Sequence, residues 1–229
     1  MLADLLGSLF VLLLVAGVPA LSHLTVRRAH LRLIPRLDLY LSAVISQWFL
    51  AALGVLVVFT AGPGLRAVGF RSVLALVFAR WALLLTVVSL AAFGLVLLLE
   101  RWGWWPEEPE LVRLLVPQTR GEKLLAVLAL APTAALCEEF LYRGYLLAQL
   151  AHWFGSVPWA WVGSSVAFGL AHTYQGWNGM GRAALLGGLL AYPVIRLGSL
   201  YPAMAAHFLI DAVALAWLGP KFLKGVSET

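Results

Sequence analysis

The chain has 229 residues, of which 62% are hydrophobic and only 12% charged, and its mean hydropathy is +0.91. A soluble domain carries roughly 25% charged residues, so this composition excludes a soluble globular fold and indicates an integral membrane protein. The net charge of +5 does not indicate a nucleic-acid partner, because the basic residues lie in short segments between apolar runs and form no dense patch.

Seven apolar runs follow one another along the chain, and about 20 residues suffice for a helix to span a bilayer. They cover approximately residues 5–21, 39–61, 73–99, 123–153, 157–171, 180–197 and 200–218. Asp4 and the lack of Lys or Arg ahead of the first run argue against a signal peptide and predict a retained transmembrane helix. Pro132 can break the fourth run, which would raise the count to eight. We predict an all-α polytopic bundle that forms a single transmembrane domain over residues 1–229.

Charged and aromatic residues between the runs predict the topology. The longest polar stretch, at about residues 100–122, holds Trp102, Trp104 and Trp105, which are typical of a membrane interface. With the N-terminus outside, eleven basic residues face the cytoplasm and three face the exterior. The eleven are Arg27, Arg28, Arg32, Arg36, Arg101, Arg113, Arg120, Lys123, Arg182, Lys221 and Lys224, and the three are Arg66, Arg71 and Arg196. The positive-inside rule therefore predicts a multi-pass protein of the cell membrane with a cytoplasmic C-terminus.

A small set of ionisable residues lies inside the apolar runs, where each charge costs roughly 2.5–3.5 kcal/mol on insertion scales. The set consists of Arg80, Glu138, Glu139, Arg143, His172, His207 and Asp211. Arg80 lies near one end of its run and is interpreted as a side chain that snorkels to the interface. The other six call for a functional explanation.

Helical spacing places the two adjacent glutamates on different faces of a helix. Glu139 and Arg143 are four residues apart, so they share a helix face and can form an ion pair. Glu138 is turned about 100° away from that face and is free to meet another element. The pair is therefore interpreted as structural, and Glu138 as the candidate for chemistry.

The same spacing recurs in the fifth and seventh runs. Phe168 and His172 place an aromatic ring beside an imidazole, and His207 and Asp211 allow the carboxylate to orient the histidine. The two histidines and the aspartate thus come from runs other than the one that carries the glutamates.

Glu138-Glu139-x-x-x-Arg143, Phe168-x-x-x-His172 and His207-x-x-x-Asp211, in this order on successive apolar blocks, resemble the three motifs of the CPBP family. This family includes the CAAX prenyl endopeptidases and the bacteriocin-processing or self-immunity (Abi) membrane proteins. The resemblance covers a motif core at about residues 123–219, whereas the first 120 residues are similar only in being apolar spans.

The resemblance implies an intramembrane endopeptidase of the glutamate type. We expect it to need no cofactor. The resemblance also implies that Glu138 is the general base, that His172 helps it to activate a water, and that His207 and Asp211 stabilise the oxyanion. Glu139, Arg143 and Phe168 would support the site. The implied partners are a peptide or membrane-protein substrate and the lipid bilayer; the oligomeric state stays open.

Two features do not fit this scheme directly. The CAAX prenyl endopeptidases commonly have asparagine at the position of Asp211, and an ionised aspartate only accepts hydrogen bonds. We therefore expect Asp211 to orient His207, which alone would donate, and a prenylated substrate is less favoured.

The second feature is the depth of the site. Glu138 lies about 15 residues, or ~22 Å, beyond Lys123, and His172 lies about as far beyond Val157, which is at the opposite side of the membrane. We therefore expect the true bounds of the fourth helix to differ from 123–153.

Three other functions remain open. The glutamates, histidines and aspartate offer ligands for a divalent metal, although no HExxH motif is present. A cysteine protease based on Cys137 is disfavoured, because the adjacent carboxylate opposes formation of a thiolate. The chain can also be a non-catalytic scaffold, a bacteriocin self-immunity protein or a transporter in which the polar cluster stabilises the bundle or lines a proton path.

Overall fold

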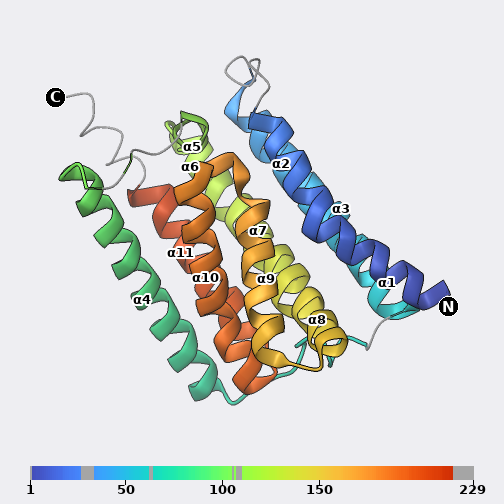
Figure 1. Ribbon diagram of the computed structural model, residues 1–229. Coiled ribbons are helices and arrows are strands. Elements are labelled where there is room, and N and C mark those ends of the chain that lie inside the picture. The colour runs from blue at the N-terminus through green and yellow to red at the C-terminus, as the bar shows by residue number, and fades with distance from the viewer. Residues whose placement is uncertain (1, 27–33, 62–63, 105, 107–109, 219–229) are drawn as a thin grey trace.

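The computed structural model describes residues 2–26, 34–61, 64–104, 106 and 110–218, and within these ranges the chain is helical and has no strand (Figure 1). The predicted all-α fold is confirmed. Six of the basic and aromatic residues that predict the topology lie outside the described ranges: Arg27, Arg28, Arg32, Trp105, Lys221 and Lys224.

Five helices of the described chain are long and apolar enough to cross a membrane, and two shorter apolar helices accompany them. The long ones are Ala3–Thr25, Arg36–Thr60, Ala75–Arg101, Arg120–Phe154 and Thr173–Leu197, and the short ones are Val157–Ala171 and Tyr201–Trp217. They correspond to the seven predicted runs. Because Arg120–Phe154 continues through Pro132 as one helix of 35 residues, the alternative count of eight is wrong.

Each long helix is labelled by its segments in Figure 1. The first is made up largely of α1 (Leu2–Leu12) and α2 (Val18–Val26), the next two are α3 (Arg36–Thr60) and α4 (Ala75–Arg101), and a short α5 (Glu110–Leu115) follows. The fourth contains α6 (Arg120–Leu125), α7 (Ala131–Glu138) and α8 (Leu147–Phe154), and after it come α9 (Val157–Ala171), α10 (Gly176–Leu197) and α11 (Tyr201–Val213).

Wider π-helical turns interrupt the first and fourth helices just before a proline. The π-helical segment Leu13–Gly17 precedes Pro19, and Ala126–Leu130 precedes Pro132. Proline lacks an N–H and its ring clashes with the carbonyl of the preceding turn, so a widened turn is one way to continue the helix. A third π-helical segment, Glu139–Leu146, holds no proline and begins within the glutamate motif; such turns are frequent at functional sites.

Two tight turns create the antiparallel hairpins that build the site. Gly155 (φ 59°) ends α8 and Gly198 (φ 65°) ends α10, and both adopt the left-handed conformation that glycine allows without a Cβ penalty. Consequently α9 runs back along the fourth helix, and α11 runs back along α10 (Figure 1).

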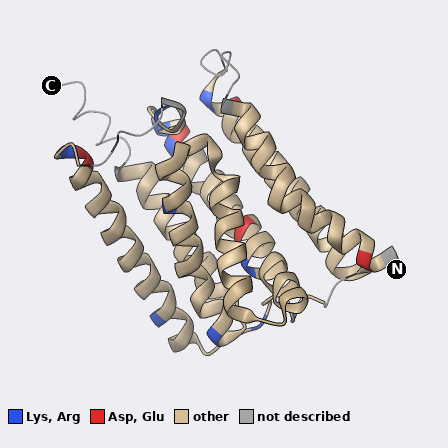
Figure 2. Cartoon of the chain, in the orientation of Figure 1, with Lys and Arg blue, Asp and Glu red and all other residues tan. Residues whose placement is uncertain are grey.

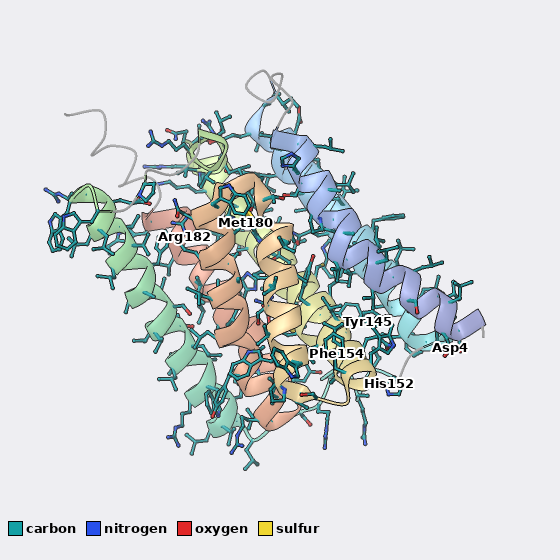
Figure 3. The ribbon with its side chains drawn as sticks, viewed as in Figure 1. Asp4, Tyr145, His152, Phe154, Met180 and Arg182 are labelled. Carbon is teal, nitrogen blue, oxygen red and sulfur yellow. The ribbon has the colours of Figure 1, made fainter. Side chains whose placement is uncertain are left out.

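Helices α7 to α11 form the centre of the bundle, with α1 to α3 on one side and α4 on the other (Figure 1). The hydroxyl of Tyr145, a residue labelled in Figure 3, donates to the Gly7 carbonyl over 3.1 Å and so ties the fourth helix to α1. On the outer surface, Leu76, Trp104 and Trp177 are among many exposed apolar side chains, as expected where lipid replaces water. Charged residues are concentrated toward the helix ends, with few midway along the bundle (Figure 2).

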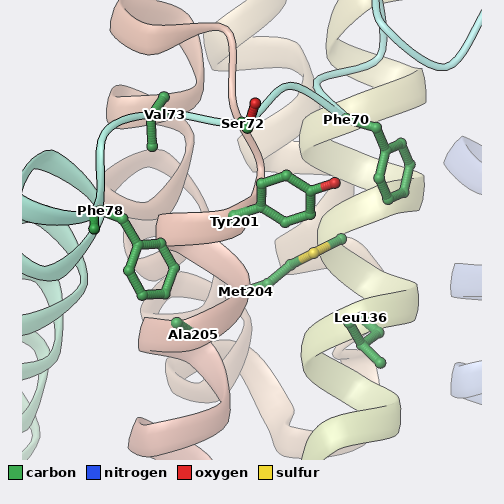
Figure 4. A pocket seen from close by; sticks show the side chains of 9 residues that line it. Phe70, Ser72, Val73, Phe78, Leu136, Tyr201, Met204 and Ala205 are labelled. Atoms are coloured by element: carbon green, nitrogen blue, oxygen red, sulfur yellow. The ribbon is translucent and has the colours of Figure 1, made fainter.

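An apolar pocket of about 470 Å³ lies between the start of α4, the segment that precedes it, α7 and α11 (Figure 4). It is lined by Phe70, Ser72, Val73, Ala75, Phe78, Leu136, Tyr201, Met204 and Ala205. The ionisable residues of the motifs are not part of this lining.

Glycines allow the close approach of backbones around the motif residues. A Cβ on Gly144 would lie 2.7 Å from the carbonyl oxygen of Val68, and one on Gly169 would lie 2.6 Å from that of Met180. Both contacts are with backbone atoms, which cannot move as a flexible side chain can.

We therefore expect Gly144→Ala to lower the free energy of unfolding by about 1–3 kcal/mol, because the added methyl overpacks a rigid contact. Denaturant unfolding in mixed micelles measures the change. Gly94→Ala is the matched control, since Gly94 lies inside α4 with open space around its Cα. Equal stability of the two variants would contradict the packing argument.

Candidate active site

Six of the seven ionisable residues singled out in the sequence converge midway along the bundle, and Arg80 is exposed near the start of α4. The converging residues are Glu138, Glu139, Arg143, His172, His207 and Asp211. Three separate segments supply them: the centre of the fourth helix, the end of α9, and α11.

The expected mismatch in depth does not occur, because Glu138 and His172 are nearly equidistant from the turn that joins α8 to α9. Glu138 precedes Phe154 by about 16 residues and His172 follows Val157 by about 15, which correspond to ~24 and ~22 Å along each helix. The expectation that the fourth helix has bounds other than 123–153 rested on this mismatch, and that reason is wrong. At 35 residues the helix exceeds the thickness of the hydrocarbon core, so counting from its two ends gives different depths.

A buried ion pair lies at the centre of the cluster. Arg143 Nη1 is 3.2 Å from Glu139 Oε1, and the side chains are 1% and 0% exposed. The same Glu139 oxygen is 2.7 Å from Nδ1 of His207. Because an ionised carboxylate only accepts, Nδ1 carries the proton of this hydrogen bond. The predicted Glu139–Arg143 pair is present, and it also connects the fourth helix to α11.

Arg143 is held on three sides. Its Nε donates to the Gly187 carbonyl over 3.3 Å, and its guanidinium carbon lies 3.8 Å from the centroid of the Phe168 ring. A Cβ on Gly187 would lie 3.2 Å from both Arg143 Nη2 and the Phe168 ring. A glycine at this position of α10 therefore leaves room for the cation and its aromatic partner.

Glu138 faces the opposite side of the cluster, with a partly exposed side chain. Its Oε1 accepts from Gln47 Nε2 over 2.9 Å. Its Oε2 lies 4.0 Å from Nε2 of His172 and 3.9 Å from Nε2 of His207. These last separations are too long for direct hydrogen bonds and match gaps that a water commonly bridges.

A backbone contact fixes the position of one proton on His172. Its Nδ1 is 2.8 Å from the carbonyl oxygen of Phe168, which can only accept, so Nδ1 carries the proton. Nε2 of the neutral ring is then an acceptor that faces Glu138. The Phe168 ring packs against this imidazole with centroids 4.5 Å apart, as the spacing predicted.

Asp211 has a different relation to His207 from the expected one. Its Oδ2 is 3.6 Å from Nε2, which exceeds hydrogen-bond distance, and its side chain is 29% exposed. Glu139, and not Asp211, makes the hydrogen bond that orients the His207 ring. Spacing along one helix could not reveal this, because Glu139 comes from another helix.

The geometry supports neither a metal-dependent reaction nor a cysteine protease based on Cys137. Within the described chain, no group of three or more His, Cys, Asp or Glu side chains is arranged to hold a metal ion. Cys137 is 1% exposed. The absence of a cofactor stays a prediction.

Two polar residues near the cluster are not among those that the sequence singled out. Gln47 is a single amide in the apolar stretch of α3, and Tyr142 precedes Arg143 with a buried hydroxyl that has no hydrogen-bond partner in the described chain. A polar residue inside an apolar run is the signal that would have singled out Gln47.

Comparison with protein families matches residues 120–213 to the model described as type II CAAX prenyl endopeptidase Rce1-like. This part of the chain is similar to the Rce1-like domains that the model describes. It contains all three motifs, so the resemblance to the CPBP family is confirmed. No curated protein and no solved structure matches the chain. Gln47 lies outside the matched residues.

Removing Arg143 is expected to be costly, because Glu139 would keep a buried charge without its cation. Arg143→Met should lower the free energy of unfolding by about 3–5 kcal/mol, as measured by denaturant unfolding in mixed micelles. Arg80→Met is the control, since Arg80 is exposed. A small change in both variants would show that the pair contributes little to stability.

Proposed function

We propose that the chain is an intramembrane endopeptidase in which Glu138 and His172 activate a water molecule for attack on a peptide carbonyl. The observation that carries the proposal is the 4.0 Å gap between Glu138 Oε2 and His172 Nε2, two acceptors that face each other near the end of α9. The Rce1-like domain supports the same reaction class.

Two acceptors at this spacing suit a water that donates one proton to each of them. A water about 2.8 Å from both atoms would direct its oxygen lone pairs away from the two residues, toward an incoming carbonyl carbon. As the water oxygen forms its bond to that carbon, Glu138 takes up the released proton. When the C–N bond breaks, the proton passes to the nitrogen of the leaving amine, and the acid and amine products balance the water consumed.

His207 would stabilise the oxyanion that forms on the carbonyl oxygen. Its Nδ1 is already committed to Glu139, so Nε2 can donate only when both ring nitrogens carry protons. Glu138, Glu139 and Asp211 lie around this ring and would stabilise its cationic form. A fixed donor in a water-poor site favours the transition state without reorganisation.

The remaining assignments follow from the same arrangement. Glu139, Arg143 and Phe168 hold the catalytic groups in place, and Asp211 adds a carboxylate beside His207. The substrate would be a peptide or membrane protein that reaches the site within the bilayer. On the eleven-to-three distribution of basic residues, we propose a cell-membrane location with the N-terminus outside.

Hydrolysis by detergent-purified protein tests the proposal. Internally quenched peptides, including CAAX sequences with and without a prenyl group, should be cleaved by the wild type, and Glu138→Gln and His172→Ala should lower kcat by at least about 100-fold. Arg80→Gln is the control for folding and purification. Equal rates in the wild type and the Glu138 variant, or no cleavage of any peptide, would instead favour a non-catalytic scaffold or self-immunity protein.

Chelation separates water activation by Glu138 from metal catalysis. Prolonged dialysis against EDTA or 1,10-phenanthroline should leave kcat unchanged, because the proposed steps use only side chains and water. Loss of activity that one added divalent metal restores would contradict this prediction and assign the cluster to a metal-dependent protease.

A further inference from the structure

We propose that Gln47, on α3, is a positioning residue that fixes the orientation of the Glu138 carboxylate. The inference rests on the proposed function, because it concerns the group that would act as base. Gln47 Nε2 donates to Glu138 Oε1 over 2.9 Å, across 91 positions of the chain. Since the carboxylate can only accept, it also determines which end of the Gln47 amide points toward it.

This contact gives the two carboxylate oxygens of Glu138 different partners. Oε1 is held by Gln47, and Oε2 is left facing His172 and His207 at 4.0 and 3.9 Å. A carboxylate on a glutamate side chain otherwise rotates about its terminal torsion at little cost. The hydrogen bond therefore keeps one acceptor oxygen aimed at the place proposed for the nucleophilic water.

The placement of Gln47 is not what helix packing alone would favour. An amide in an apolar bundle must be desolvated, and its Oε1 is buried without a hydrogen-bond partner among the described residues. A second hydrogen bond already links α3 to α7 one residue further along, from Trp48 Nε1 to Thr133 Oγ1 over 3.0 Å. The half-satisfied amide is thus better explained by its contact with Glu138 than by adhesion between the two helices.

Through Gln47, α3 contributes a hydrogen-bond donor to the site. The Rce1-like domain covers residues 120–213 and excludes α3, so the domain by itself would lack the donor to Glu138. In the whole bundle, α3 packs along the fourth helix (Figure 1). This packing places the Gln47 amide next to Glu138.

Steady-state kinetics on the full chain test this role. Gln47→Met keeps the length of the side chain and removes the donor, and it should lower kcat about 10- to 100-fold while KM stays within about twofold. Thr133→Val is the matched control, because it removes a different hydrogen bond between α3 and α7 and leaves both partners of the Gln47–Glu138 contact unchanged. It should retain the kcat of the wild type.

Gln47→Leu carries the same expectation and replaces Gln47→Met if that variant does not give a folded, monodisperse protein in micelles. Wild-type kcat in either folded Gln47 variant would overturn the inference, and so would equal losses in the Gln47 and Thr133 variants, which would indicate a structural role only. Failure of the proposed function is distinguishable, because the wild type would then be no faster than Glu138→Gln.

Discussion

The buried ion pair between Glu139 and Arg143 is the constraint on which the rest of the site depends. A charge in an apolar bundle is tolerated only with compensating partners, and here each member of the pair also binds a further helix. Glu139 accepts from His207 on α11, and Arg143 donates to Gly187 on α10 and lies over Phe168 on α9. Satisfying one pair of charges thus fixes the relative positions of four segments of the chain.

This arrangement gives the two adjacent glutamates different surroundings. Glu139 is fully buried and its Oε1 binds permanent partners, whereas Glu138 keeps a partly exposed carboxylate with one oxygen free of a direct hydrogen bond to either histidine. His172 is held by a backbone carbonyl in the tautomer whose free nitrogen faces Glu138. Glu139 is therefore bound directly by Arg143 and His207, whereas Glu138 Oε2 stays 4.0 and 3.9 Å from the two histidines.

Much of this follows from the sequence. Apolar runs long enough to span a bilayer predict the helices, since backbone groups in lipid must be satisfied within each segment. Spacing by four residues predicted both the Glu139–Arg143 pair and the contact of Phe168 with His172, because such residues share a helix face. The ionisable residues of the site were identifiable from their cost in an apolar setting, with Arg80 as the exception near a helix end.

Contacts between helices were decided only by the tertiary structure. The sequence assigned Asp211 to orient His207, but the ring is bound by Glu139, since proximity between helices has no counterpart in spacing along one of them. The common depth of Glu138 and His172 depended on the length of the fourth helix and on the turn at Gly155. Gln47 was recognisable as a polar residue in an apolar run, yet its partner 91 positions away appears only when α3 packs against α7. The sequence by itself therefore determined which residues are costly to bury, and the packing of the helices decided which of them stabilise one another.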